Sequence, residues 1–314
     1  MNKVIVLGAT GGTGQALVYE LLQRNIQVIA FGRSKRKLET LIKKHNNANL
    51  TYALGDIFNY QSILEASENV DIIFQCANVP YQEMKSKLPI IGENVMQVAD
   101  KLEKKIVIID GIYVYGRQCA QGDENHPKLP NTKKGAIRLQ FENLIFDKNK
   151  WTKAKPLIVR LPDYFGPSAQ NTYLQPTIDG VLNNKHTIFI GNLKTSREYI
   201  YLPDAAKMIV NIAEKETSYE ENWNIPGSNP ISGKEIIHKI RKITNYKKRI
   251  IPLNKLMISL IGRFNPFMRE IIEMMYITKE GFILNGDKYQ NRIGPIVRTD
   301  FDKALKETLN RADD

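Results

Sequence analysis

The first seventeen residues constrain the fold of this chain more than any other stretch. Residues 4–7 are apolar, Gly8, Gly11 and Gly14 follow at intervals of three, and an amphipathic pattern resumes at Leu17. A glycine loop between a buried strand and a helix predicts a cradle for the pyrophosphate of a dinucleotide. The glycines allow a tight turn, a close approach of the backbone to the phosphates and close packing of the helix, whose free amides meet the anion.

Length and composition fit a globular protein. The chain has 314 residues, of which 42% are hydrophobic and 25% are charged, so it can bury one large core or two unequal ones. The first predicted strand begins at Lys3 and no apolar run reaches the length of a membrane span, so we expect a cytoplasmic protein with no membrane partner. Cys76 and Cys119 lack metal and disulfide patterns and the histidines are scattered, so we expect no metal site.

The formal net charge of +12 raises the question of a nucleic-acid partner. Basic runs lie at residues 33–37 and 239–249, but the other basic residues are scattered and no recognition motif accompanies them. Solvated lysine-rich helix faces account for most of the excess. We therefore expect no nucleic-acid partner and a small-molecule substrate, and the sequence leaves a homodimer open.

Short apolar runs alternate with helical patterns after the glycine loop. Strands are predicted at 26–31, 50–54, 71–74 and 106–110, and a helical segment at 87–104. This rhythm predicts right-handed crossovers and a doubly wound parallel sheet. Ligands of such sheets bind at the carboxyl ends of the strands.

The end of the second predicted strand has no carboxylate. In this architecture an acidic side chain there would bind the 2′-hydroxyl of NAD, but the sequence reads Gly32-Arg33-Ser34. Arg33 can make a forked, charge-assisted contact to a phosphate. The pattern therefore favours NADP(H) over NAD(H).

Several motifs together carry a family resemblance. They are Gly8-x-x-Gly11-x-x-Gly14, Gly55-Asp56, Cys76-Ala77, Val114-Tyr115-Gly116, the run from Arg160 to Pro167, and the run from Arg197 to Asp204. In this order and spacing the chain resembles the extended short-chain dehydrogenase/reductases, and most of all the atypical branch of the NAD-dependent epimerase/dehydratase family. The resemblance extends to residues 295–309, which look like the family's last strand and helix.

The resemblance implies an α/β fold, a Rossmann-type doubly wound parallel sheet with a small C-terminal α/β substrate lobe. Residues 1–165 would form the dinucleotide-binding domain, to which 199–225 return, and 166–198 with 226–314 would form an interwoven substrate lobe. The implied cofactor-binding residues are Gly8, Thr10, Gly11, Gly12, Thr13 and Gly14 at the pyrophosphate, Arg33 and Ser34 at the 2′-phosphate, Asp56 and Ile57 at the adenine, Cys76, Ala77 and Asn78 at the ribose side, and Arg138 and Pro162 near the nicotinamide.

The resemblance fails at the catalytic positions. The family uses a Ser or Thr after the fifth strand, then a Tyr and a Lys four residues apart on the next helix. Alignment of Val114-Tyr115-Gly116 puts Gly111 at the hydroxyl position, and alignment of residues 134–142 puts Lys134 and Arg138 at the other two. All three usual catalytic groups are therefore replaced.

Other residues could take over proton transfer. Arg138 can hydrogen-bond a ribose but cannot carry a proton. Lys134 can, because Arg138 and an oxidised nicotinamide would both destabilise its ammonium. Tyr113 and Tyr115 are alternative donors that Asp110 could orient. Each also has a structural interpretation: Tyr115 could simply pack, Lys134 could be solvated, and Asp110 could cap a turn.

Residues in the C-terminal half are predicted to contact the nicotinamide and the substrate. Tyr164 and Phe165 could pack against the nicotinamide ring. By the resemblance Arg197 would bind an anionic substrate, and the alternative is that it forms a structural salt bridge. A helix is expected at 171–183, and apolar helical stretches at 256–261 and 264–276 predict core or a lid over a pocket.

We therefore predict an NADP-dependent oxidoreductase or epimerase/dehydratase-like enzyme acting on a small carbonyl, hydroxyl or sugar-type substrate. The alternative is a non-catalytic NADP(H)-binding regulator or redox sensor of the same fold, since the usual Ser, Tyr and Lys are missing. Neither the substrate nor the direction of hydride transfer can be read from the sequence.

Overall fold

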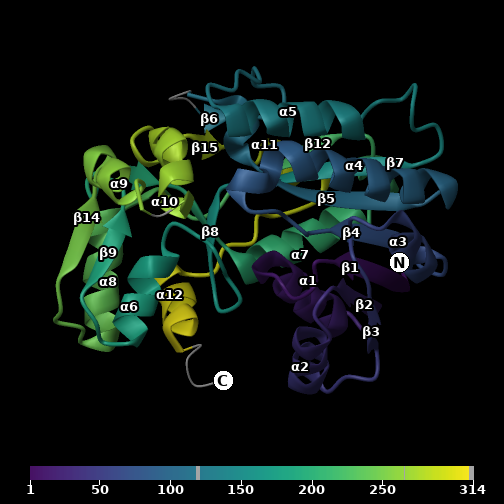
Figure 1. Cartoon of the computed structure of the whole chain (residues 1–314). Coiled ribbons are helices and arrows are strands. Elements are labelled where there is room, and N and C mark those ends of the chain that lie inside the picture. The colour runs from purple at the N-terminus through teal and green to yellow at the C-terminus, as the bar shows by residue number, and fades with distance from the viewer. Residues whose placement is uncertain (118–120, 265, 311–314) are drawn as a thin grey trace.

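A seven-stranded parallel sheet forms the centre of the protein (Figure 1). The computed structural model describes residues 1–117, 121–264 and 266–310, so Cys119 lies outside the described residues. Each strand pairs in parallel with its neighbours. The spatial order is β12 (Asn222–Asn224), β7 (Lys155–Leu161), β5 (Lys105–Gly111), β4 (Ile72–Gln75), β1 (Lys3–Leu7), β2 (Gln27–Gly32) and β3 (Leu50–Leu54). This is the predicted doubly wound, Rossmann-type arrangement, whose strand order reverses between β1 and β4.

Helices cover both faces of the sheet, as a parallel sheet requires. In β1, Val4 and Val6 point into one apolar core, and Ile5 and Leu7 point into the other. The first core is closed by α1 (Gly12–Gln23), α2 (Lys35–His45) and α7 (Leu202–Ala213), and the second by α3 (Tyr60–Ser67), α4 (Met84–Lys101) and α5 (Lys133–Ile145). The near-continuous burial of β1 explains why its sequence is a run of apolar residues rather than an alternating pattern.

A smaller lobe lies beside the carboxyl ends of the strands (Figure 1). Its core contains α6 (Gln175–Leu182), the parallel pair β9 (Thr187–Ile190) and β14 (Ile250–Leu253), α8 (Gly233–Thr244) and α12 (Phe301–Leu309). Ser232 and Glu235 form a reciprocal capping box at the start of α8. The apolar stretches predicted as core or lid fold as α9 (Lys255–Ile261), α10 (Pro266–Ile271) and the 3-10 helix η4 (Ile272–Thr278).

The remaining elements are short. They are η1 (Tyr81–Glu83), η2 (Ile112–Tyr115), β6 (Gln121–Gly122), β8 (Asp163–Phe165), β10 (Ser196–Arg197), β11 (Tyr199–Tyr201), η3 (Glu216–Ser218), β13 (Ile231–Ser232), β15 (Ile283–Leu284) and α11 (Asp287–Arg292). Among the described residues, no helix combines the length and apolarity that a membrane crossing needs.

Three local predictions were wrong. The helix expected from residue 171 begins only at Gln175, because Asn171 has a positive φ and Thr172 accepts a hydrogen bond from the Gln175 amide. Residues 295–300 form no strand, since that segment leads directly into α12. Phe165 does not wall the cleft at the strand ends. Its side chain is 1% exposed and packs against Tyr201 and Phe301.

We predict that Gly14→Ala lowers the free energy of unfolding by about 2 kcal/mol or more, because the new methyl would overlap the Gly8 carbonyl and lie 2.8 Å from the Ala9 Cα. Gly11→Ala is the matched control, since its methyl would meet only the Gly8 oxygen, at 3.3 Å. Urea unfolding midpoints measure the difference. Equal midpoints for the two variants would show that the close packing of α1 on the loop is not a constraint.

Candidate functional site

A cleft of about 550 Å³ opens where the strand order reverses, and we call it the switch-point cleft. The loops after β1, β2, β4, β5 and β7 all contribute to it, because the carboxyl ends of parallel strands meet at one edge of the sheet. Most residues predicted to bind a cofactor line it: Gly8, Thr10, Gly11, Gly12, Thr13, Arg33, Ile57, Cys76, Ala77, Asn78, Arg138 and Pro162. Gly14, Ser34 and Asp56 are not among its lining residues.

The glycine loop presents backbone donors to this cleft. Gly11 is the N-cap of α1, and the first turn of the helix carries no acidic residue. In the described part of the chain, the amides of Gly12, Thr13 and Gly14 have no hydrogen-bond acceptor. A β-carbon at Gly11 would have only one atom within 4 Å, so this side of the loop is open. The arrangement suits an anion held by a helix N-terminus.

Arg33 lies at the mouth of the cleft, just after β2. Its side chain is exposed and has no ion-pair partner among residues 1–117, 121–264 and 266–310. Ser34 is engaged elsewhere, because its hydroxyl accepts a hydrogen bond from the Lys37 amide as the N-cap of α2. The Asp56 carboxylate likewise accepts from the Phe58 amide, at 3.0 Å. Of these three residues, only Arg33 lines the cleft, although the Ser34 hydroxyl still has its own proton to donate.

The loop after β4 is held by a residue that the sequence analysis did not single out. The Gln75 side chain accepts from the Ala77 amide at 3.0 Å and donates to the Ala77 carbonyl at 2.8 Å. Gln75 is buried at the end of β4, and its only signal in the sequence is that a polar residue closes an apolar run. Its two bonds fix the backbone opposite Gly8. The Cys76 thiol nearby has its pKa raised by burial.

Arg138 reaches the floor of the cleft from α5. Its guanidinium forms a buried ion pair with Asp110 at 2.9 Å and donates to the Asn78 side chain at 2.9 Å. Asp110 therefore partners Arg138, and the expected orientation of a tyrosine by Asp110 is not observed. The Nε of Arg138 is buried without a hydrogen-bond partner in the described structure. A donor remains available there for a ligand oxygen.

Two tyrosines meet beyond Arg138. The hydroxyls of Tyr81 and Tyr113 are 2.8 Å apart, and both residues line the cleft. Burial is the main cause that raises the pKa of Tyr113 well above its usual value, with the neighbouring Tyr81 adding to the effect. Tyr113 is therefore a protonated phenol at neutral pH and can donate a proton.

Tyr115, the other tyrosine proposed as a donor, does not line the cleft. It is 0% exposed, and its hydroxyl donates to the Asn224 side chain at 2.8 Å. Its ring packs against Phe282. The structure thus gives Tyr115 the packing role that was the alternative interpretation.

Lys134 lines a second cavity and is not among the lining residues of the switch-point cleft. Its Nζ lies 2.7 Å from a Glu270 oxygen and 2.9 Å from a Glu273 oxygen, and its amide donates to Glu273 at 3.1 Å. Its ammonium also lies 5.3 Å from the centre of the Tyr81 ring. The prediction that positive groups would destabilise the Lys134 ammonium is therefore wrong, because two carboxylates bind it. These ion pairs hold α10 and η4 against α5.

Asp163, Tyr164 and Tyr173 also line the cleft. Arg197 is 4% exposed, pairs with Asp163 at 3.2 Å and lies over the rings of Tyr173 and Tyr199. This is the structural salt bridge that was the alternative to a substrate contact. Burial raises the pKa of the Asp163 carboxyl and Arg197 opposes that shift. The Tyr173 hydroxyl is buried and has no partner among the described side chains and backbone.

The sheet order and the glycine loop at its switch point define a Rossmann-type α/β protein. The chain belongs to the NAD dependent epimerase/dehydratase family, whose model matches residues 4–225. This confirms the family that the sequence motifs resemble.

Individual relatives agree with this family. The dTDP-4-dehydro-6-deoxyglucose reductase of Escherichia coli is 26% identical over 271 residues, which are 80% of this chain and 84% of that protein. The UDP-glucose 4-epimerase of Rickettsia prowazekii (strain Madrid E) is 32% identical over 129 residues, 36% of this chain and 38% of that protein. The crystal structure of UDP-glucuronic acid 4-epimerase from Bacillus cereus in complex with NAD has the same fold, with a TM-score of 0.78, 19% identity, and coverage of 99% of this chain and 98% of that one.

We predict that Lys134→Met lowers the free energy of unfolding by about 1 to 3 kcal/mol, because Glu270 and Glu273 lose their shared counter-ion while remaining partly buried. Adding Glu270→Gln and Glu273→Gln removes both orphaned charges and should restore part of the loss. Chemical denaturation of the three proteins measures the effect. A Lys134→Met protein as stable as the wild type would contradict the docking role.

Proposed function

We propose that this protein binds a pyridine dinucleotide in the switch-point cleft and uses it to oxidise, reduce or epimerise a small carbonyl or hydroxyl compound of the sugar class. The observation that carries the proposal is the continuity of one cleft. It runs from the open amides at the start of α1, past Arg33, to Arg138 and Tyr113. Its volume of about 550 Å³ lies in the range of ligand and cofactor sites.

The residues present fit the cofactor. Gly8 has a φ of +81°, and any β-carbon there would lie 2.7 Å from the Ala77 backbone, so the turn requires glycine. The free amides of α1 would hold the pyrophosphate, and Ala77 and Asn78 would lie at the ribose side. Arg138, with an unpartnered buried Nε, would hydrogen-bond the nicotinamide ribose. When bound, the nicotinamide supplies or accepts a hydride.

We further propose a preference for NADP(H). The end of β2 has no carboxylate to bind a free 2′-hydroxyl, and the exposed Arg33 guanidinium can bind a phosphate in a forked geometry. Ser34 could add its backbone amide, or the proton of the hydroxyl that caps α2.

Tyr113 is the proposed proton donor. Its hydroxyl lines the cleft and is protonated at neutral pH, so it could protonate a substrate oxygen as hydride arrives. The raised pKa makes this phenol a weaker acid than an ordinary tyrosine, and the positive charge that the nicotinamide gains as the hydride leaves would oppose that effect. The unpartnered hydroxyl of Tyr173 and the ring of Tyr164 would position the substrate. A reductase and an epimerase among the relatives, both named for sugar nucleotides, support the sugar class. The pairing of Arg197 with Asp163 leaves that arginine poorly placed to grip a diphosphate.

A second function, NADP(H) binding without turnover, has one specific observation in its favour. Lys134 and Arg138, which occupy the positions of the family's Tyr and Lys, are both locked in ion pairs. A regulator would keep the cofactor cleft and lose proton transfer, so turnover measurements separate the two functions.

We predict that Arg33→Asp weakens NADPH binding by about 10- to 100-fold and NADH binding much less, because one charge-assisted contact to the 2′-phosphate is lost and a repulsive one is gained. Fluorescence titration with both cofactors measures this. Lys43→Asp changes the same charge on the exposed face of α2, away from the cleft, and should leave both affinities unchanged. An equal loss for NADPH and NADH in Arg33→Asp would refute the phosphate assignment.

We predict that Tyr113→Phe lowers kcat for carbonyl reduction by about 100-fold or more without changing the Kd of NADPH, because it removes only the proton donor. Tyr115→Phe deletes the neighbouring buried hydroxyl and should keep its activity. The assay is NADPH oxidation with a panel of ketones, aldehydes and 4-keto sugar nucleotides. Tight NADPH binding with no turnover of any of them would favour the regulator.

A further inference from the structure

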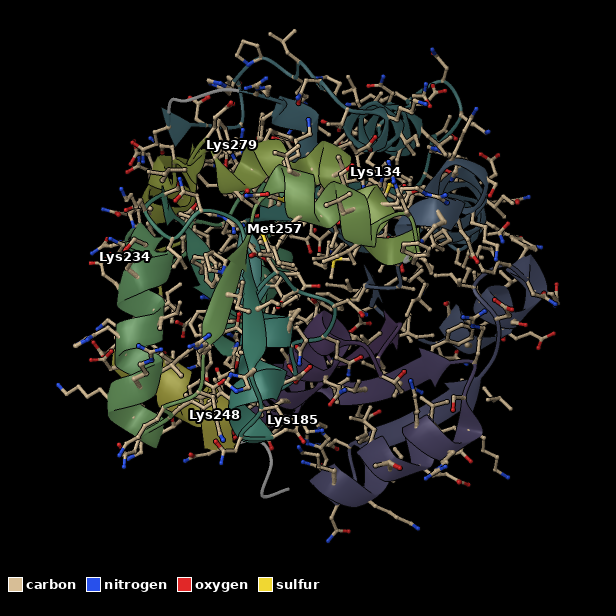
Figure 2. The ribbon with its side chains drawn as sticks, turned by 60° about the vertical axis from the view of Figure 1, so that its left-hand side comes forward. Lys134, Lys185, Lys234, Lys248, Met257 and Lys279 are labelled. Atoms are coloured by element: carbon tan, nitrogen blue, oxygen red, sulfur yellow. The ribbon has the colours of Figure 1, made fainter. Side chains whose placement is uncertain are left out.

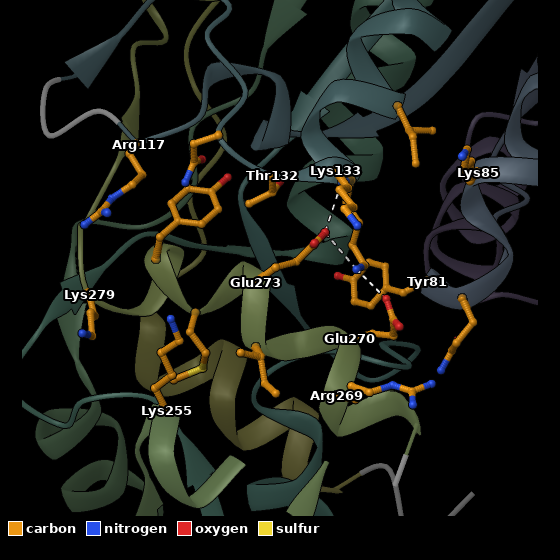
Figure 3. A pocket seen from close by; sticks show the side chains of 17 residues that line it. Tyr81, Lys85, Arg117, Thr132, Lys133, Lys255, Arg269, Glu270, Glu273 and Lys279 are labelled. Atoms are coloured by element: carbon orange, nitrogen blue, oxygen red, sulfur yellow. Dashed lines mark hydrogen bonds and ion pairs between the residues drawn. The ribbon is translucent and has the colours of Figure 1, made fainter. Parts of the chain in front are cut away.

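A second cavity lies on the other side of Tyr81 from the switch-point cleft, and we call it the basic pocket. Its volume is about 880 Å³. It is bounded by η1 and the start of α4, by the start of α5, and by α9, α10 and η4 (Figure 3). Among the described residues, Tyr81 alone lines both cavities. The basic pocket is therefore a separate compartment.

The lining of the basic pocket carries an excess of positive charge. Seven basic and two acidic side chains line it: Lys85, Arg117, Lys133, Lys134, Lys255, Arg269 and Lys279, against Glu270 and Glu273. Both carboxylates are bound to Lys134. Arg117 has a carboxylate of its own, that of Glu280. Lys134 offsets one of the two negative charges of Glu270 and Glu273, so the basic residues of the lining still exceed the acidic ones.

Five cations remain without a counter-ion. In the described part of the chain, none of them has a carboxylate within ion-pair distance; they are Lys85, Lys133, Lys255, Arg269 and Lys279. They come from α4, α5, α9, α10 and the residue after η4, and they line one concavity. Like charges gathered in this way repel one another and raise the local potential, which attracts an anion.

The cations lie at both ends of the pocket. Figure 3 shows Glu270 and Glu273 in the middle, with Arg117, Lys255 and Lys279 on one side of them, Lys85 and Arg269 on the other, and Lys133 above them. An anion with two charged groups could therefore contact cations on both sides. Arg269 adds a planar fork that matches phosphate oxygens.

We propose that the basic pocket binds a small polyanion with two or more phosphate groups, of the pyrophosphate or bisphosphate class. The site uses none of the residues assigned to the dinucleotide. It does not depend on the proposed function, because its cations would hold such an anion whether or not the switch-point cleft turns over a substrate.

The test is isothermal titration of the full chain with inorganic pyrophosphate at about 0.15 M salt, where long-range attraction is screened. Lys133→Gln/Lys255→Gln removes two of the unpaired cations, which come from different helices. Both are the first residues of helices, where loss of a positive charge is tolerated. We expect pyrophosphate affinity to fall about tenfold or more.

Lys234→Gln/Lys248→Gln is the matched control. It makes the same change in net charge at two exposed lysines of the small lobe, far from the pocket (Figure 2). We expect its pyrophosphate affinity to stay at the wild-type value. Absence of saturable binding to the wild type, or an equal loss in both double variants, would overturn the proposal, because the attraction would then be a property of net charge alone.

A third variant distinguishes pyrophosphate binding in the basic pocket from binding in the switch-point cleft. Pyrophosphate can also occupy the cradle of the switch-point cleft, so Gly11→Asp places a carboxylate there and blocks it. We expect Gly11→Asp to lose NADPH binding and keep the site that Lys133→Gln/Lys255→Gln removes. If Gly11→Asp instead abolishes all pyrophosphate binding, the basic pocket is refuted while the cofactor site stands.

Discussion

The structure depends on how closely α1 approaches the end of β1. A side chain at Gly14 would overlap the Gly8 carbonyl, so the helix can begin directly beyond the strand only with glycine there. This contact aims the first amides of α1 at the point where the sheet reverses its order. The parallel pairing of the sheet brings the loops after β2, β4, β5 and β7 to the same edge, and α5 adds Arg138.

Ion pairs decide which polar residues remain available for chemistry. Arg138 is held by Asp110, Arg197 by Asp163, and Lys134 by two carboxylates. Each is at most 6% exposed, and a buried charge is tolerated only when it is paired. Consequently the groups best suited to meet a ligand are those without partners: the α1 amides, Arg33, the Nε of Arg138 and the hydroxyl of Tyr173.

Tyr81 separates two cavities of different character. Its hydroxyl meets Tyr113 in the switch-point cleft, and its ring lies against the Lys134 ammonium beside the basic pocket. The helices α9, α10 and η4 close the second cavity from the small lobe, held to α5 by Glu270 and Glu273. The segment predicted as core or lid therefore does both: Met274 is buried in the lobe, and Met275 also lines the basic pocket.

The sequence by itself determined the parallel sheet, the glycine loop and the family, because these follow from local periodicity and from residues a few positions apart. Most of the residues that it identified as cofactor-binding do line the switch-point cleft, since strand ends can be located from apolar runs. Only the tertiary structure decided the partners of the charged residues. Lys134 meets carboxylates 136 and 139 residues away, and Arg197 meets Asp163 across 34 residues. No local pattern encodes such pairings, because they arise when separate elements pack together and buried charges must find a counter-ion.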